Sequence, residues 1–222
     1  MRQDYISLRM DEFGQWLAHI AQVKKEARWS EAAEIVGKRL RRLLGRPTSA
    51  FVKLTESDLL AALVSKGPTL WVPYKMIMLI ALLKEAGDVA TARYPPRGGH
   101  GWYLKALHLL LDALIHQELG HYSELAPGIE TLLIALGDSP LPVRTRLRLI
   151  REYDRRGCFR QVRDEFLIAL ARAPKNSSLL NFGIALFERL GHENDATLVG
   201  GGMRRSELEA TLAELLARKR AL

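Results

Sequence analysis

Cysteine and long apolar runs are scarce in this sequence of 222 residues. Because Cys158 is its only cysteine, the chain has no intramolecular disulfide and no zinc site built from several cysteines. The longest apolar run, Met76 to Leu83, is much shorter than the roughly 20 residues that cross a bilayer as a helix. No basic segment followed by an apolar stretch opens the sequence, so we expect no signal peptide, no membrane partner and a cytoplasmic location.

Recognisable catalytic motifs are lacking too. The sequence contains no phosphate-binding loop ending in Lys-Ser or Lys-Thr, no nucleophile elbow, no His-Glu-x-x-His zinc motif and no paired cysteines. The glycines of the loop 94–101 resemble a phosphate-binding turn only superficially, and we interpret this loop as an insertion between two helices. These absences favour a binding protein without a cofactor over an enzyme.

Basic charge is what the sequence has in excess. The chain has 33 Lys and Arg residues against 25 Asp and Glu, a net charge of +8, and 23 of the basic residues are arginines. A guanidinium group binds carboxylates and phosphates through two parallel hydrogen bonds, so this excess fits an acidic partner. Genome composition or a hot habitat produces the same bias, and composition alone leaves these explanations open.

Apolar residues recur at spacings of three and four along most of the chain, and strict alternation is almost absent. This pattern predicts an all-α protein with helices at 3–26, 30–44, 56–65, 73–86, 102–118, 127–136, 142–156, 159–173, 177–190 and 203–219. Thr55 and Asp58 form an N-terminal capping pattern before one of them. A glycine follows six of these stretches, as helix C-termini favour: Gly45, Gly87, Gly120, Gly137, Gly157 and Gly191. We therefore expect helical hairpins joined by tight turns.

One segment, 149–174, has a distinctive order of residues around a turn: Leu149, Ile150, Tyr153, Gly157, Phe159, Val162, Phe166, Ala169 and Pro174. This order resembles a tetratricopeptide (TPR) unit, apart from Arg146 and Ile150, which replace a bulky and a small residue. In such a unit small residues let two antiparallel helices approach, aromatic rings fill the space between them, and a proline ends the second helix.

Weaker copies of this pattern occur at 16–36, 79–92, 109–125 and 180–196. The turn glycines assigned to four copies, Gly87, Gly120, Gly157 and Gly191, are 33, 37 and 34 residues apart, close to the TPR period of about 34. Residues 46–72 fit no copy, and the loop 94–101 interrupts one. Residues 1–199 therefore resemble a degenerate, right-handed TPR-like array of stacked antiparallel hairpins, and the layout also resembles a bacterial TPR-like family with no assigned activity.

Residues 200–222 form a separate C-terminal segment. Gly200, Gly201 and Gly202 predict a hinge or a sharp turn. On the helix that follows, four leucines form one apolar stripe: Leu208, Leu212, Leu215 and Leu216. The sequence leaves two uses of this stripe open, namely sealing the last hairpin and forming a homodimer contact.

A row of arginines marks the helix predicted at 142–156. Arg144, Arg148, Arg151 and Arg155 are spaced four, three and four residues apart, so they lie within about 60° of one another, opposite the apolar stripe. Like charges on one stripe repel one another unless an acidic surface neutralises them. We therefore predict that this row binds an acidic protein or peptide; the alternative is an ordinary solvated face.

The TPR resemblance extends this predicted surface. In TPR proteins the first helix of each hairpin lines a concave groove, and some grooves hold a terminal carboxylate of the partner. The resemblance implies a groove lined here by Lys24, Lys84, Arg144, Arg151, Arg155, Asn181 and Arg189. A second basic cluster, residues 38–42, ends a predicted helix, where cations stabilise the helix dipole.

Two other functions stay open. A basic helical repeat can follow the phosphate backbone of a nucleic acid, although we expect Trp16, Trp29 and Tyr153 to be used in packing rather than in base stacking. A more remote alternative is a metal-binding protein or a metal-dependent enzyme. It rests on three residues that share one helix face and suit zinc: His108, Asp112 and His116.

Overall fold

The computed structural model describes residues 2–45, 51, 53–65, 72–95, 98–116 and 124–221, with only the backbone for residues 2–4. Within these ranges the chain forms eleven helices and no strand, which confirms the predicted all-α class. No helix in the described part is long and apolar enough to cross a membrane. The chain divides into two compact units, Met1–Ser139 and Pro140–Leu222.

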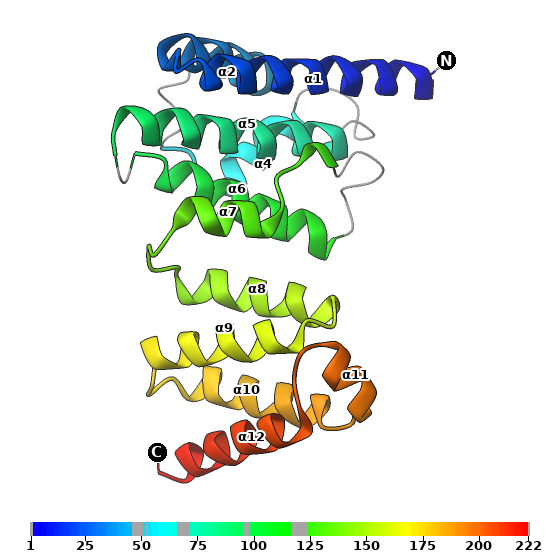
Figure 1. Ribbon diagram of the computed structural model, residues 1–222, viewed down its shortest axis with the longest axis vertical. Coiled ribbons are helices and arrows are strands. Elements are labelled where there is room, and N and C mark those ends of the chain that lie inside the picture. The colour runs from blue at the N-terminus through cyan, green and yellow to red at the C-terminus, as the bar shows by residue number, and fades with distance from the viewer. Residues whose placement is uncertain are drawn as a thin grey trace. The chain divides into compact units, whose positions relative to one another are not determined.

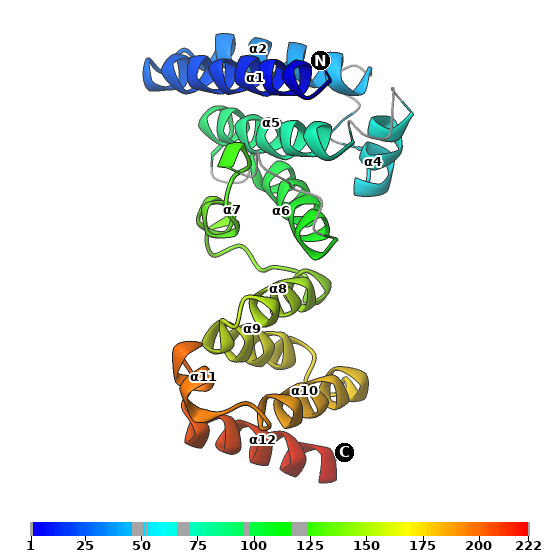
Figure 2. The ribbon, with the colours of Figure 1, turned by 90° about the vertical axis from the view of Figure 1, so that its right-hand side faces the viewer.

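In the described part of the N-terminal unit, Figure 1 labels six helices: α1 (Arg2–Lys25), α2 (Trp29–Leu44), α4 (Glu56–Val64), α5 (Val72–Arg93), α6 (His100–Ile115) and α7 (Ile129–Leu136). The hairpin of α1 and α2 packs on one side of α5, and α6 packs on another side of it. α7 continues the stack by packing on α6, as both Figures 1 and 2 show. α4 lies against α2, α5 and α6.

The central position of α5 follows from its composition. Its side chains Ile77, Leu79, Ile80, Leu82 and Leu83 point in all directions around the helix, and all are buried. A helix that is apolar on every side has to be covered on every side. α5 therefore becomes the helix against which the others of this unit pack.

Gly87 does not lie in a turn, and the prediction that a helix ends at residue 86 is wrong. α5 continues without interruption to Arg93, and Gly87 is buried within it. A Cβ atom at this position would overlap the ring of Tyr103 on α6. The glycine is required because two helices approach closely there, so it does not mark a repeat boundary. Gly120, the next turn glycine of the predicted series, lies outside the described residues.

The C-terminal unit contains the other five helices: α8 (Val143–Arg155), α9 (Phe159–Arg172), α10 (Ser177–Leu190), α11 (Asp195–Gly200) and α12 (Arg205–Arg220). α8 and α9 form a hairpin, α9 also contacts α10, and α12 packs on α10 (Figure 2). The ring of Phe166 on α9 lies directly over Gly183 of α10 and contacts Phe187, with 5.5 Å between the two ring centroids. This aromatic contact joins the hairpin to α10.

The three glycines before α12 belong to a packed connection. Gly200 ends α11, a short helix that the sequence did not predict. The carbonyl of Gly201 accepts a 3.0 Å hydrogen bond from the backbone amide of Arg160 on α9. Leu208 and Leu215 of α12 are buried within the same chain. These contacts favour the sealing role of α12, while the homodimer contact stays a prediction.

Candidate partner-binding surface

α8 has an apolar face and, opposite it, a basic face, as its sequence predicts. Leu149, Ile150 and Tyr153 are buried, and α8 packs on α9. On the opposite face the arginines at 144, 151 and 155 are exposed and Arg148 is half-buried. We call the row Arg144, Arg148, Arg151 and Arg155, together with Arg189 of α10, the arginine surface.

One carboxylate below this surface orients two arginines. Glu152 is fully buried and accepts hydrogen bonds from Nε and Nη2 of Arg155, at 2.9 and 2.8 Å, and from Nε of Arg156, at 2.6 Å. Burial by itself would raise the pKa of Glu152, but these hydrogen bonds and the two positive charges hold it below its ordinary value. Glu152 is therefore ionised at neutral pH and keeps Arg155 in one orientation.

A second ion pair ties α8 to α10. Arg189 donates from Nη2 to both carboxylate oxygens of Asp154, at 2.6 and 2.7 Å. The side chains of Arg189 and Arg155 still keep 51% and 48% of their area exposed. Both guanidinium groups are thus held on one side and open to a further ligand on the other. Asn181 is also exposed on α10, about two turns before Arg189.

Arg144 and Arg151 differ from these paired arginines. Both are exposed, and within the described residues neither has an ion pair or a side-chain hydrogen bond. They are seven residues apart, so they lie almost in line along the helix, two turns from each other. The two charges face solvent with no carboxylate of the described chain beside them.

Most of the net positive charge of the chain lies in this unit. Residues 140–222 contain 16 Lys and Arg against 10 Asp and Glu, so they carry +6 of the net charge of +8. The N-terminal unit is close to neutral by the same count, with 17 basic and 15 acidic residues. An acidic ligand is therefore attracted mainly to the C-terminal unit.

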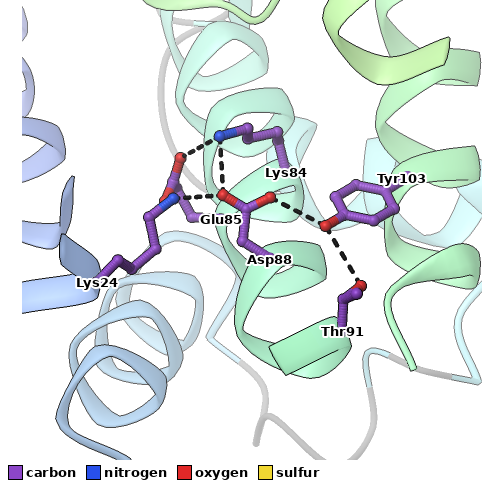
Figure 3. A network of polar contacts seen from close by, with 6 residues as sticks. All are labelled: Lys24, Lys84, Glu85, Asp88, Thr91 and Tyr103. Atoms are coloured by element: carbon purple, nitrogen blue, oxygen red, sulfur yellow. Dashed lines mark hydrogen bonds and ion pairs between the residues drawn. The ribbon is translucent and has the colours of Figure 1, made fainter. Parts of the chain in front are cut away.

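Lys24 and Lys84, which the TPR resemblance places in a groove, lie instead in an ion-pair network of the N-terminal unit (Figure 3). Nζ of Lys24 contacts Oε2 of Glu85 at 2.5 Å and also contacts Asp88. Nζ of Lys84 is 3.1 Å from Oε1 of Glu85 and 2.9 Å from Oδ2 of Asp88. With only 14% and 23% of their side chains exposed, the lysines pair with Glu85 and Asp88, and Lys24 joins α1 to α5 through them.

The same network reaches α6. The hydroxyl of Tyr103 donates to Oδ1 of Asp88 at 3.0 Å and accepts from the hydroxyl of Thr91 at 3.4 Å. Burial, helped by the charge of Asp88, raises the pKa of Tyr103 to about 12. Burial would also raise the pKa of Asp88, but hydrogen bonds from the two lysines lower it. The sequence signals only the Lys84–Asp88 pair, four residues apart, since Lys24 is 64 residues from Asp88.

The predicted metal site is not formed. His108 is buried, and its Nδ1 lies 2.6 Å from Oε1 of Glu56 on α4, whereas His116 is exposed at the end of α6. His116 is the C-cap residue of α6, directly after the last helical residue, Ile115. In the described ranges no group of three His, Cys, Asp or Glu side chains is arranged to hold a metal ion.

A different basic group was missed by the sequence reasoning. Residues 38–42 were assigned to the stabilisation of a helix end, yet Arg39 places its guanidinium carbon 3.3 Å from the centroid of the Trp16 ring on α1. Trp16 and Arg39 belong to different helices, so only the packing of α1 on α2 brings them together. They stand at the wall of a cavity with further basic side chains.

Comparison of this chain with family models, curated proteins and solved structures finds no match. The function of the arginine surface therefore has to be inferred from its own geometry and charge.

Proposed function

We propose that the protein is a non-catalytic interaction scaffold, built of TPR-like hairpins, whose arginine surface binds an acidic segment of a protein or peptide. The observation that carries this proposal is the exposed pair Arg144 and Arg151, for which the described chain supplies no counter-charge. Repulsion between like charges on one helix face falls when a carboxylate-bearing partner covers them. The stability of the complex then comes partly from charges that the free protein leaves unpaired.

The two arginines that already have an acidic partner hold their guanidinium groups in a defined orientation for a ligand. Arg155 and Arg189 are already oriented by Glu152 and Asp154, so binding orders fewer side-chain rotamers than it would for free arginines. A planar guanidinium group presents its remaining N–H donors in a fixed fork that matches a carboxylate. Because the surface is exposed, each contact adds roughly 0.2–1 kcal/mol, and binding weakens as salt rises.

Protein is a better ligand than nucleic acid for this surface. Asp154, with 26% of its side chain exposed, lies among the arginines of α8, and its carboxylate opposes a continuous run of phosphates. The aromatic residue of α8, Tyr153, is buried and does not stack on a base. The +6 charge of residues 140–222 still favours nucleic acid as the second candidate, and the experiment distinguishes the two.

The test compares two full-length variants of equal net charge. R144E/R151E reverses the two unpaired arginines, and the matched control K219E/R220E reverses two exposed cations at the end of α12. Wild type and both variants are used to capture partners from native lysate, with and without nuclease, and the bound proteins are quantified by mass spectrometry.

We expect wild type and K219E/R220E to capture the same proteins, and R144E/R151E to lose the acidic ones while its circular dichroism spectrum is unchanged. Identical capture by all three proteins would contradict the proposal. Loss of the captured material on nuclease treatment would assign the surface to nucleic acid.

A further inference from the structure

A cavity of about 290 Å³ lies between α1, α2 and α5 in the N-terminal unit. Its wall combines two kinds of side chain and, within the described residues, no carboxylate. The apolar part is formed by Phe13, Trp16, Leu43, Met78 and Leu82. The basic part is formed by Arg9, Arg39, Arg42 and Lys75. A ligand that fills this cavity therefore meets both an apolar surface and positive charge.

The apolar wall is held rigidly. Phe13 and Leu82 are buried in the core of the unit. The ring of Trp16 packs edge-on to Phe13, with 6.4 Å between the centroids and 87° between the ring planes. Arg39 covers the face of Trp16 through a cation–π contact, which fixes both side chains. The cavity is thus shaped before a ligand arrives.

The four basic side chains are not equivalent. Arg9 is paired with Glu12 at 3.1 Å and with the hydroxyl of Tyr5, and Lys75 donates to the carbonyl of Leu63 at 3.3 Å. In the described part of the chain, Arg39 and Arg42 have no carboxylate within ion-pair distance. The site therefore has two cations that internal partners already hold and two that are open to an anion.

The pKa of Arg39 is consistent with the absence of a paired carboxylate. Burial lowers its pKa, and the charge of Arg42 lowers it further, against a smaller opposite effect of Glu12. A guanidinium group stays protonated in spite of such a shift, so two like charges stand side by side next to an apolar cavity. An anion placed between them would remove this repulsion.

We propose that this cavity binds a small amphiphilic carboxylate, that is, an aliphatic or aromatic acid. Its carboxylate pairs with Arg39 and Arg42, and its apolar body lies on Phe13, Trp16 and Met78. The volume is near the lower end of the roughly 300–1,000 Å³ of ligand pockets, which suits a short apolar body. The proposal uses none of the residues of the arginine surface and stands independently of it.

The first experiment measures how much the charged group and the apolar chain of the ligand each contribute to binding. Octanoate, 1-octanol and octylammonium share one apolar chain and differ in charge, and acetate has the charged head without the chain. Isothermal titration of the full-length protein with each compound measures both contributions. We expect octanoate to bind about tenfold or more tighter than 1-octanol, octylammonium to bind more weakly than 1-octanol, and acetate not to bind.

The second experiment locates the site. R39Q/R42Q should bind octanoate and 1-octanol equally, because the preference for the anion is lost. R42Q alone, a milder variant, should reduce this preference without abolishing it, because Arg39 remains. M78Q keeps the length of the side chain but removes an apolar contact, so it should lower the affinity for octanoate and for 1-octanol by a similar factor. R41Q is the matched control, since Arg41 is exposed on α2 beside these residues and does not line the cavity; it should behave as wild type.

Three results would overturn the assignment. Octanoate and octylammonium binding with equal affinity would show that the cations do not select the ligand. Unchanged octanoate binding by R39Q/R42Q and R42Q would place the ligand elsewhere. Binding of a leucine-terminated peptide with a free carboxylate, but not of its amide and not of octanoate, would make the cavity a peptide site.

Discussion

The hydroxyl of Tyr103 on α6 donates a 3.0 Å hydrogen bond to Asp88 on α5, and the ring of the same tyrosine lies over Gly87, the residue next to Asp88. One side chain thus joins the closest approach of two helices to the ion-pair network that also holds α1 (Figure 3). The packing and the polar network of the N-terminal unit are therefore coupled at this residue.

Substitution of Gly87 by alanine should destabilise the protein. In a helix interior alanine is normally more favourable than glycine by about 0.5–1 kcal/mol, but here its methyl group meets the Tyr103 ring. We expect a net loss of about 1–3 kcal/mol in the free energy of unfolding, measured by urea denaturation. Gly101 on α6 is the control, because a Cβ there meets no atom within 4 Å, so Gly101→Ala should be neutral or stabilising.

Replacement of Asp88 by asparagine should cost stability in a way that depends on pH. The pKa of Asp88 in the folded protein is below its ordinary value, so the carboxylate stabilises the fold above about pH 4 and loses this contribution as pH falls through the folded pKa. We expect Asp88→Asn to lower the free energy of unfolding by about 1–3 kcal/mol at pH 7. The difference from wild type should shrink on acidification.

The matched control for this pH experiment is Asp11→Asn, at an exposed position of α1. It should change stability little at any pH. A difference between wild type and Asp88→Asn that stayed constant from pH 7 to pH 3 would contradict a lowered pKa for Asp88.

Glu152→Gln tests the buried support of the arginine surface. A glutamine in this place leaves Arg155 and Arg156 without their counter-charge and presents N–H donors to other donors. The expected loss in the free energy of unfolding is about 1–3 kcal/mol at pH 7, measured by chemical denaturation. Glu188→Gln, at an exposed position of α10, should have an effect close to zero. Equal effects of the two substitutions would show that burial of Glu152 is unimportant.

Thr55→Ala removes one half of a capping box at the start of α4. The hydroxyl of Thr55 accepts a 3.2 Å hydrogen bond from the backbone amide of Asp58, whose carboxylate accepts one of 2.9 Å from the amide of Thr55. We expect a loss of about 0.5–2 kcal/mol and faster amide hydrogen exchange confined to α4. Ser57→Ala, within the first turn, is the control and should leave exchange unchanged. Faster exchange in both variants would argue against a specific cap.

The helices themselves were predictable because the interactions that start and end them are local. The predicted limits 56–65, 142–156 and 177–190 differ from α4, α8 and α10 by a residue or less at each end. The capping pattern of Thr55 and Asp58 is confirmed as a capping box, and the apolar stripe of α8 is buried as predicted. Each of these features depends on residues within about four positions of one another.

The failures come from contacts between distant residues. The sequence around Gly87 resembles a helix end. The structure instead requires a glycine there because the ring of Tyr103 on the next helix leaves no room for a Cβ atom. The TPR resemblance implied that Lys24 lines a groove, but Lys24 contacts Glu85 and Asp88, the second of them 64 residues away, and these contacts form only after α1 has packed on α5. His108 meets Glu56 in the same way, across two helices.

The sequence by itself determined that this protein is all-α, where its helices lie, and that one face of α8 carries a row of arginines. Periodicity and helix ends decide these features, and both are properties of neighbouring residues. The tertiary structure decided which charges remain available. It neutralised Lys24 and Lys84, oriented Arg155 and Arg189, left Arg144 and Arg151 without a carboxylate, and placed Arg39 over Trp16. Each charge belongs to a single residue, but whether an opposite charge neutralises it depends on which side chains packing places within a few ångströms.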